Sequence, residues 1–433
     1  MKKDRIVVRP AGPLRGILDI PGDKSISHRS IMMGSLARGR TLVENFLSSA
    51  DCLSTAALFR SMGVRIRIHG RRVLVEGAGL NGLKAPRAVL DAGNSGTTAR
   101  ILLGLLSAQA FTSRLTGDRY LRRRPMRRVV EPLSRMGAVI TGGKDDDHLP
   151  LTLRPATLKG ITYRSPVSSA QVKSAILMAG LFAMGTTKVV EPVPSRDHTE
   201  RMFRLFGLPL RQRGRTVSLK GPVGPFRARR ILVPGDISSA SFFLVAGLIT
   251  PGARLLLRNV GINPTRTGIL DVLKRMGARI SILRRRGSKG AEPMADLLVE
   301  YSRLKGVTVG GALVPRMIDE FPVLAVAATQ AEGLTLVKDA GELRVKESDR
   351  IASMEVNLRR MGAEITATKD GWIIQGPNRL KGGVFDSFGD HRIAMSLAVA
   401  GLVADSPVTV LDTKNVATSF PTFEKLLKRI TRT

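Results

Sequence analysis

The sequence of 433 residues is almost free of cysteine, since Cys52 is the only one. One thiol cannot build a disulfide framework, and such a composition is typical of proteins that work in a reducing cytoplasm. The opening residues, MKKDRIVVRP, carry cations but no apolar stretch of the kind found in secretory signals. We therefore expect no secretory signal and a cytoplasmic location.

Long hydrophobic runs are also lacking. The longest uncharged run covers residues 237–253, begins among serines and contains Pro251-Gly252, so it is a poor candidate for a membrane span. Aromatic residues make up only 4% of the chain, which leaves few platforms on which the bases of a single-stranded nucleic acid could stack. We expect a soluble protein with no membrane partner.

Acidic residues are scarce relative to basic ones. The chain has 69 Lys and Arg against 35 Asp and Glu, a formal net charge of +34. Such a field attracts anions, either nucleic acid or small phosphorylated metabolites. The arginines are scattered in short groups at 122–124, 211–215, 227–230 and 284–286, so charge alone does not choose between these partners.

What the sequence does contain is a sixfold repeat. Six segments combine a small and apolar helix-like run, a short break and a β-branched run typical of a strand. They begin at Ser30, Arg100, Ala175, Phe242, Phe321 and Arg392. A helix that is apolar on all sides belongs inside a domain, so we expect six inner helices.

A second signature alternates with the first. FRSMGVRI (59–66), LSRMGAVI (133–140), FRLFGLPL (203–210), LKRMGARI (273–280) and LRRMGAEI (358–365) each indicate the end of an amphipathic helix, a glycine after its last turn, and a strand. FEKLLKRI (423–430) resembles a sixth such helix whose strand is missing. Six units, each with one inner and one surface helix, predict an α/β fold.

Two nearly identical short segments indicate where the six units divide into two domains. IPGDKS (20–25) and VPGDIS (233–238) each end a strand just before an inner helix, and Pro-Gly at both places suits a pair of chain crossings. We expect one domain of residues 21–233 and a second of residues 1–20 plus 234–433, with three units in each.

Polar residues gather just before each inner helix. The segments are PGDKSISHR, DAGNSGTTAR, SPVSSAQVKS, PGDISSAS, PRMIDEF and DSFGDHR. Helix N-termini carry unpaired N–H groups and a partial positive charge, so they attract anions. If three such ends share one face in each domain, two cationic faces would oppose each other across a cleft and hold an anionic ligand.

Simpler interpretations remain open for single motifs. Ser, Asp and Asn at helix starts are often only caps, and GNSGTTAR lacks the lysine of an ATP-binding loop. His28 and His391 could ligate a metal, but without cysteine partners they fit ordinary structural roles better. KESDR (346–350) could be a solvated charge run or a functional loop. Asp319, a carboxylate among apolar neighbours, suits general-base chemistry.

Eight motifs in this order resemble the 5-enolpyruvylshikimate-3-phosphate synthase family: PGDKSISHR, GNSGTTAR, RRRPM, SSAQVKSA, MIDEFP, KESDR, GDHRIAM and TSFPTF. The resemblance covers essentially the whole chain. It implies a two-domain inside-out α/β barrel of six βαβαββ-type repeats, three per domain, with a cleft between the domains. It also implies enolpyruvyl transfer from phosphoenolpyruvate to the 5-hydroxyl of shikimate 3-phosphate, releasing phosphate, without metal or organic cofactor.

The resemblance further implies roles for single residues. Those expected to hold shikimate 3-phosphate are Lys24, Ser25, Arg29, Ser169, Ala170, Gln171, Arg196, Asp319 and Lys346. Those expected to hold phosphoenolpyruvate are Lys24, Gly96, Arg124, Gln171, Arg350 and Arg392. Asp319 would accept the 5-hydroxyl proton and Glu347 would protonate the methylene carbon, with Lys24 as a further catalytic residue. The first domain would bind shikimate 3-phosphate and the second much of the phosphoenolpyruvate.

Three positions depart from one branch of the family. Thr418 stands in place of a lysine, Ala170 in place of a serine, and Glu342 in place of an asparagine. Gly96 is retained, so the resemblance implies inhibition by glyphosate, which competes for the phosphoenolpyruvate site. We expect a monomer that binds no specific nucleic acid.

Two alternatives are weighed against this hypothesis. An enolpyruvyl transferase acting on a UDP-amino sugar shares the repeat architecture, but it uses a cysteine after the second inner helix, and residues 111–128 contain none. A nucleic-acid-binding protein could exploit the +34 charge, and its affinity would fall steeply with salt.

Overall fold

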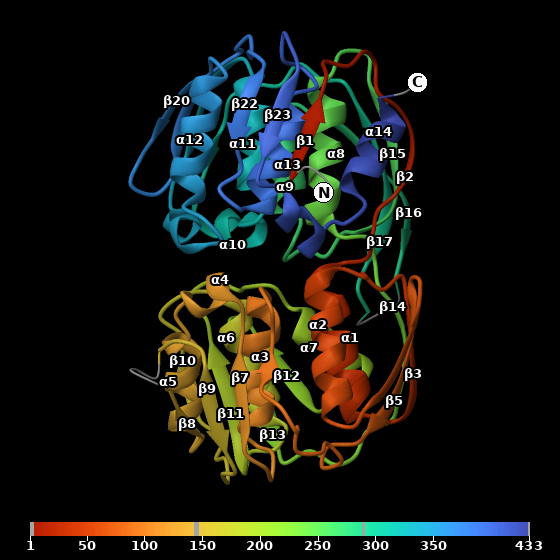
Figure 1. Cartoon of the computed structure of the whole chain (residues 1–433), viewed down its shortest axis with the longest axis vertical. Coiled ribbons are helices and arrows are strands. Elements are labelled where there is room, and N and C mark those ends of the chain that lie inside the picture. Colours follow the sequence, from red (N-terminus) through yellow and green to blue (C-terminus); the bar gives the residue numbers. More distant parts are fainter. Residues whose placement is uncertain (1–3, 143–146, 288–290, 432–433) are drawn as a thin grey trace. The chain divides into compact units, whose positions relative to one another are not determined.

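The computed structural model of the protein describes residues 4–142, 147–287 and 291–431. The chain divides into two compact units, which are drawn in Figure 1. The terminal unit contains Met1–Pro21, Pro234–Gly287 and Pro293–Thr433. The inserted unit contains Gly22–Val233 together with Ser288–Glu292. No feature of the sequence pointed to the short last segment of the inserted unit.

The inserted unit alternates strands and helices. Its strands are β3 (Arg38–Glu44), β4 (Arg65–His69), β5 (Arg72–Ala78), β6 (Leu90–Asp91), β7 (Ser113–Thr116), β8 (Val139–Thr141), β9 (Leu151–Arg154), β10 (Thr162–Arg164), β11 (Gly185–Val190), β12 (Leu210–Arg213), β13 (Thr216–Gly221) and β14 (Arg230–Leu232). Its helices are α1 (Lys24–Leu36), α2 (Ala50–Ser61), α3 (Gly96–Leu106), α4 (Arg119–Arg122), α5 (Arg127–Arg135), α6 (Ala170–Gly180) and α7 (His198–Leu205).

The terminal unit follows the same alternation. Its strands are β1 (Arg5–Val8), β2 (Arg15–Asp19), β15 (Arg254–Gly261), β16 (Arg279–Arg286), β17 (Met294–Glu300), β18 (Thr308–Val309), β19 (Gly333–Val337), β20 (Glu364–Ala367), β21 (Trp372–Gly376), β22 (Gly383–Asp386) and β23 (Val408–Leu411). Its helices are α8 (Ile237–Ile249), α9 (Gly268–Arg275), η1 (Gly311–Leu313), α10 (Val314–Met317), α11 (Phe321–Thr329), η2 (Gly341–Val345), α12 (Arg350–Arg360), α13 (His391–Ala400), η3 (Lys414–Thr418) and α14 (Phe423–Ile430).

The strands within the described ranges form six small sheets with one plan. A parallel pair is extended by an antiparallel hairpin, as where β10 runs parallel to β11, β11 antiparallel to β13, and β13 antiparallel to β12. The sixth sheet, β1-β23-β22, has three strands, and α14 is the last helix of the described chain. The prediction of an α/β fold with six βαβαββ-type repeats is confirmed.

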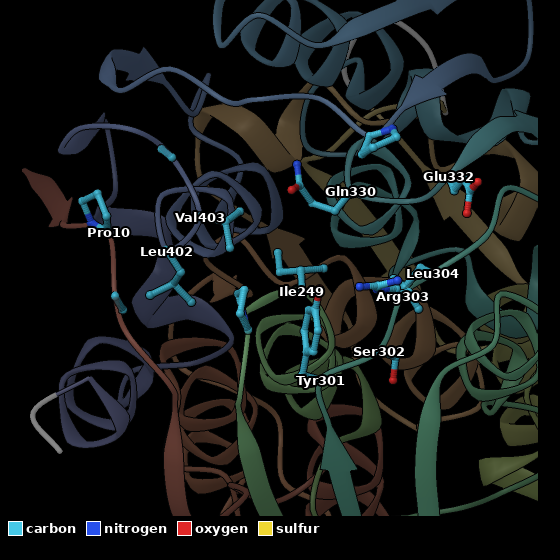
Figure 2. Close-up of a pocket in the computed structure, with 14 residues that line it drawn as sticks. Pro10, Ile249, Tyr301, Ser302, Arg303, Leu304, Gln330, Glu332, Leu402 and Val403 are labelled. Atoms are coloured by element: carbon cyan, nitrogen blue, oxygen red, sulfur yellow. The ribbon is translucent and has the colours of Figure 1, made fainter.

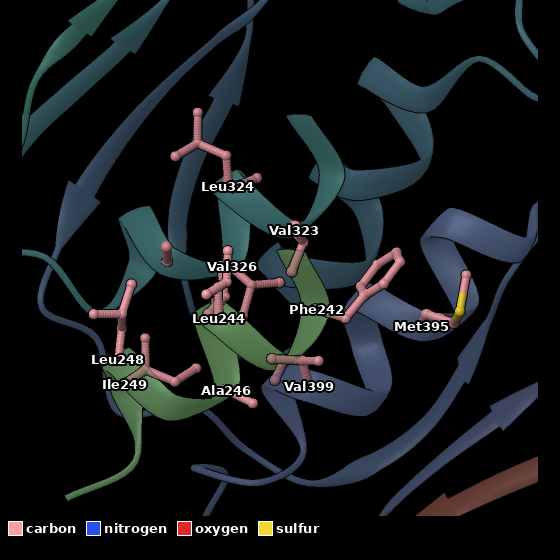
Figure 3. Close-up of a cluster of buried hydrophobic side chains, with 14 of the residues drawn as sticks. Phe242, Leu244, Ala246, Leu248, Ile249, Val323, Leu324, Val326, Met395 and Val399 are labelled. Atoms are coloured by element: carbon pink, nitrogen blue, oxygen red, sulfur yellow. The ribbon is translucent and has the colours of Figure 1, made fainter. Parts of the chain in front are cut away.

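The apolar helices lie inside their units. In the terminal unit α8 packs on α11 and α13, and every residue of α8 and α11 is buried. Figure 3 shows Phe242 and Leu244 of α8 near Val323 of α11 within this core. Each such side chain contributes about 1.5–3 kcal/mol when fully buried. In the inserted unit α3 likewise packs on α6 and α1.

A glycine ends five of the outer helices, as the second sequence signature predicts. The left-handed backbone at this position reverses the chain, and glycine adopts it without a steric cost. At the end of α2, for example, Val64 N–H donates back to the Phe59 carbonyl at 3.0 Å. The positive φ angles lie between 76° and 99° at Gly63, Gly137, Gly207, Gly277 and Gly362.

The first strands of two repeats are exchanged. β2 precedes α1 in the chain, yet it pairs in parallel with β15 of the terminal unit. β14 precedes α8, yet it pairs in parallel with β3 of the inserted unit. The chain passes between the units directly after each of these strands. None of the described helices is long and apolar enough to cross a bilayer.

Candidate functional site

Polar side chains meet where α8, α11 and α13 begin. Ser238 in the first turn of α8 donates to Glu320, the residue before α11. Arg392 near the start of α13 donates from Nη1 to the Asp319 carbonyl at 3.1 Å, and its Nε lies 3.5 Å from Asp319 Oδ1. The three N-termini therefore converge within the terminal unit, as the sequence predicts.

Arg350, the first residue of α12, is the centre of a carboxylate cluster. Its side chain is 1% exposed, and it donates from Nη1 to Asp319 Oδ1 at 3.3 Å and from Nη2 to Glu347 Oε2 at 2.5 Å. Nε donates to Asp390 Oδ2 at 2.8 Å. Burial opposes the charge of Arg350, but the three carboxylates outweigh it and raise the pKa of Arg350 above its ordinary value.

Asp390 is a buried member of this cluster that the sequence did not single out. It is fully buried at the N-cap of α13, where Oδ1 accepts from the Arg392 backbone N–H at 2.8 Å. Its other oxygen holds Arg350. One carboxylate therefore contacts two of the three arginines that the resemblance assigns to phosphoenolpyruvate, Arg350 through its side chain and Arg392 through its backbone. The GDHR motif contains this aspartate, but an N-cap aspartate is so common that the pattern alone indicates no role.

Lys346 and Glu342 lie beside this cluster. Lys346 Nζ donates to Glu342 Oε1 at 3.3 Å. Burial lowers the pKa of Lys346, and the nearby carboxylates of Glu342 and Asp319 oppose this shift. Glu342, one of the departures from the family pattern, therefore accepts from a predicted substrate lysine. Thr418, another departure, donates to the Asn415 carbonyl at 2.6 Å within η3.

The inner helices of the inserted unit also bring their N-termini together. Gln171 at the start of α6 donates from Nε2 to Thr97 Oγ1 in α3 at 3.2 Å. Its Oε1 accepts from Arg100 Nη1 at 2.7 Å. Arg100, a buried residue of the GNSGTTAR motif, was not predicted as a site residue.

Gly96, the first residue of α3, lies beside two guanidinium groups. A Cβ atom at this position would be 3.4 Å from Arg100 Nη1 and 3.4 Å from Arg124 Nη1. Arg124 donates from Nη2 to Asn94 Oδ1 at 3.3 Å. The hydrogen of glycine leaves space next to both cations, which is consistent with the expected glyphosate sensitivity; that sensitivity stays a prediction.

Several other predicted residues of the inserted unit lie at or just before helix starts. Lys24, the first residue of α1, pairs with Asp51 Oδ2 at 3.1 Å. Ser169 caps α6 by accepting from the Val172 N–H, and Ala170 is the first residue of that helix. Arg196 lies in the loop before α7 and is partly exposed.

Arg29, a predicted substrate residue of this unit, is buried, with 4% of it exposed. Nε donates to Thr199 Oγ1 and Nη2 to Ser174 Oγ, both at 2.7 Å, while Nη1 donates to the Ser25 carbonyl at 2.9 Å. Burial lowers the pKa of Arg29 to about 10, opposed most strongly by Glu200. Arg29 therefore remains a cation at neutral pH.

His28, one of the two histidines considered as metal ligands, fits the structural interpretation. His28 Nδ1 lies 2.7 Å from Thr55 Oγ1. Burial, followed by Lys24 and Arg29, lowers the pKa of His28 well below its ordinary value, so the ring is neutral. The residues described here include no group of three or more His, Cys, Asp or Glu side chains arranged to hold a metal ion.

Cys52 is expected to be chemically inert in the folded protein. The thiol is fully buried in α2, and burial raises the pKa of Cys52, so the reactive thiolate is scarcely populated. N-ethylmaleimide at pH 8 should leave the native protein unmodified and should add one equivalent in guanidinium chloride, as mass spectrometry would show. Rapid modification of the native protein would contradict this prediction and revive a cysteine-dependent mechanism.

A separate hollow of about 680 Å³ lies at the other ends of the inner helices of the terminal unit. Figure 2 shows Ile249, which ends α8, with Gln330 and Leu402, which follow α11 and α13. Helix C-termini present carbonyl oxygens and partial negative charge, which do not favour an anion. The hollow contains none of the predicted site residues, so we do not assign the substrates to it.

Comparison with known proteins identifies the family. The family described as EPSP synthase (3-phosphoshikimate 1-carboxyvinyltransferase) matches residues 8–427. The chain belongs to the EPSP synthase family. A relative named 3-phosphoshikimate 1-carboxyvinyltransferase from Geobacter sulfurreducens is 58% identical over 97% of this chain and 98% of its own length.

Other members of the EPSP synthase family agree over similar lengths. A relative of the same name from Bacillus cereus is 52% identical and covers 99% of this chain and 100% of its own length. A solved structure of EPSP synthase from Acinetobacter baumannii has a TM-score of 0.89 and 47% identity, with 99% of this chain and 98% of that chain covered. The fold predicted from the resemblance is therefore confirmed.

Proposed function

We propose that this protein transfers the enolpyruvyl group of phosphoenolpyruvate to the 5-hydroxyl of shikimate 3-phosphate and releases phosphate. Membership of the EPSP synthase family supports this reaction. The observation that carries it is the cluster in which two arginines, Arg350 and Arg392, share the Asp319 carboxylate. A pair of cations next to a carboxylate suits an anionic substrate that must also lose a proton.

The terminal unit would supply the addition chemistry. Asp319 accepts the proton of the 5-hydroxyl while the oxygen bonds to C2 of phosphoenolpyruvate, and Glu347 gives a proton to C3. This forms a tetrahedral intermediate, from which the C–O bond to phosphate then breaks as C3 loses a proton. Arg350 and Arg392 hold the carboxylate and phosphate of phosphoenolpyruvate, since their planar guanidinium groups match both.

The inserted unit would bind most of the shikimate 3-phosphate. Arg29 and Arg196 are the cations for its anionic groups, and Gln171 is held in place by Arg100 and Thr97. The cap of α6 adds backbone N–H groups near Ser169 and Ala170. Gly96, Arg124 and Lys24 would contact phosphoenolpyruvate.

A phosphate-release assay tests the proposed function. We expect release only when shikimate 3-phosphate and phosphoenolpyruvate are both present. Replacing shikimate 3-phosphate by UDP-N-acetylglucosamine should abolish release. Release with the UDP-amino sugar, or with neither acceptor, would overturn the proposal in favour of the alternative transferase or a hydrolase.

The lowered pKa of Lys346 predicts how binding depends on pH. Lysine loses its charge as pH rises, and here the loss begins below the ordinary value of about 10.4. The KM for shikimate 3-phosphate should therefore rise at alkaline pH, while Lys346→Arg, which stays charged, should remove this rise. Identical alkaline profiles for wild type and Lys346→Arg, from steady-state kinetics between pH 7 and pH 10, would exclude Lys346 from the binding step.

We further propose that the enzyme is a cytoplasmic monomer. The single buried cysteine supports a reducing compartment, since it offers no disulfide. Sedimentation equilibrium of the purified chain, with and without both substrates, tests the monomeric state.

A further inference from the structure

We propose that Thr199 is a positioning residue that holds Arg29 in the orientation needed to bind shikimate 3-phosphate. The inference rests on the proposed function, and it adds a residue for which neither the motifs nor the family resemblance provides a role. Thr199 lies in the first turn of α7, 170 positions along the chain from Arg29.

The geometry around Arg29 is a closed triangle of short hydrogen bonds. Arg29 donates from Nε to Thr199 Oγ1 and from Nη2 to Ser174 Oγ, each at 2.7 Å. The hydroxyl oxygens of Thr199 and Ser174 are 2.6 Å apart. One edge of the planar guanidinium group is therefore held by two different helices, α6 and α7, which leaves little rotational freedom.

The hydrogens of this network can be accounted for one by one. Ser174 has a single hydroxyl hydrogen, and the Ala170 carbonyl, 2.5 Å away, can only accept it. Thr199 must therefore donate its own hydrogen to Ser174 Oγ. Each hydroxyl then accepts from Arg29 and donates onward, and the chain of donors ends at Ala170, itself a predicted substrate residue. A methyl group at position 199 would break this chain and leave Arg29 Nε without its acceptor.

Three other residues in the first turn of α7 make their own polar contacts, which fix the position of Thr199. Glu200 pairs with Lys173 at 2.7 Å. His198 Nδ1 lies 2.7 Å from Glu292 Oε1, and Arg201 donates from Nη1 to the Ala291 carbonyl at 3.0 Å. The two last contacts come from the short segment that joins the inserted unit from a distant part of the sequence.

Thr199→Val keeps the shape of the side chain and removes only the hydroxyl. We expect the KM for shikimate 3-phosphate to rise about tenfold or more, because a hydrogen bond to a buried charged group is lost. The kcat and the KM for phosphoenolpyruvate should change by less than about twofold, and Thr199→Ser should restore the wild-type KM. A change shared equally by both substrates would instead indicate a general loss of structure and overturn the proposal.

A double-mutant cycle shows whether Thr199 acts through Arg29. In an Arg29→Ala background, Thr199→Val should weaken shikimate 3-phosphate binding by less than about twofold more, because the group that it positions is already gone. Calorimetric titration measures these affinities directly. Losses that multiply in the double variant would show that Thr199 acts independently of Arg29 and overturn the inference.

The matched control is Thr187→Val in the same unit. Thr187 is also fully buried, and its hydroxyl has no hydrogen-bond partner among the residues described, so both kinetic constants should stay unchanged. If Thr199→Val does not fold, Ser174→Ala, which removes the other acceptor of Arg29, must give the same substrate-selective rise in KM. If the wild type turns over and Thr199→Val has normal kinetic constants, only this inference is contradicted. Failure of the wild type to turn over or bind shikimate 3-phosphate contradicts the proposed function itself.

Discussion

Replacing Asp319 by alanine is expected to lower kcat by about 100- to 10,000-fold, the usual contribution of a positioned acid or base. Binding of shikimate 3-phosphate should change little. Oδ1 of Asp319 faces both Arg350 and Arg392, so its removal leaves these two cations with less negative charge around them. Phosphoenolpyruvate, an anion, should therefore bind at least as tightly as before. Steady-state kinetics and calorimetric titration separate the two effects.

Asp271→Ala is the matched control for Asp319→Ala. Asp271 lies in α9 of the same unit and pairs at the surface with Arg316, at 2.6 Å. Exposed pairs contribute only about 0–1 kcal/mol, so turnover should stay normal. A kcat close to that of the wild type in Asp319→Ala would remove Asp319 from the catalytic residues.

Replacing Lys173 by methionine is expected to destabilise the inserted unit by about 3–5 kcal/mol. Lys173 Nζ lies 2.8 Å from Glu191 Oε2 and 2.7 Å from Glu200 Oε1. The three side chains are 3%, 3% and 0% exposed, so the variant leaves two carboxylates buried without their cation. Hydrogen exchange of α6 and α7 should accelerate, and it is the appropriate probe because the single tryptophan, Trp372, lies in the terminal unit.

Two further variants separate the contribution of charge to stability from that of packing among Lys173, Glu191 and Glu200. Glu191→Gln keeps the Lys173–Glu200 pair, so its loss of stability should be less than half of that in Lys173→Met. Lys188→Met, at an exposed position of β11, should leave hydrogen exchange unchanged. Equal losses in Lys173→Met and Glu191→Gln would show that packing, not the uncompensated carboxylates, determines the stability.

The difference in stability between wild type and Lys173→Met should depend on pH in a way that the pKa of Lys173 determines. Burial alone would lower the pKa of Lys173, but Glu200 and Glu191 raise it above its ordinary value. Because its pKa is raised by folding, charged Lys173 contributes its full stabilisation at every pH below the pKa of lysine in the unfolded chain, about 10.4. This contribution is lost only as the pH rises through the pKa of Lys173 in the folded protein. The difference between wild type and Lys173→Met should therefore stay constant between pH 7 and pH 9.

The repeat and its inner helices could be predicted because they depend on local pattern. A run such as that around Phe242 is apolar at every position, and only a buried helix accommodates it. The grouping of Asp319 with Arg392 also followed from the sequence. Asp319 lies just before one inner helix and Arg392 in the first turn of another, and the repeat places these N-termini at the same end.

The supporting contacts could not be predicted, because they join residues that are distant in the sequence and common in type. A threonine such as Thr199 at a helix start indicates a cap, and nothing near it in the sequence identifies Arg29 as its partner. Glu292 gives no sign that it faces His198, since its neighbours in the chain form strands of the other unit. Side-chain pairs of this kind depend on tertiary packing, not on periodicity.

Because β2 and β14 are exchanged, each lies next to one inner helix in the sequence but pairs within the sheet of another repeat. The strand pairings therefore do not depend on where the chain begins. If the ends were joined and the chain reopened at residue 234, β1 and β2 would follow α14, and every strand of the terminal unit would lie in one uninterrupted stretch. Such a circular permutant would preserve each strand pairing described above while altering only the loops between them.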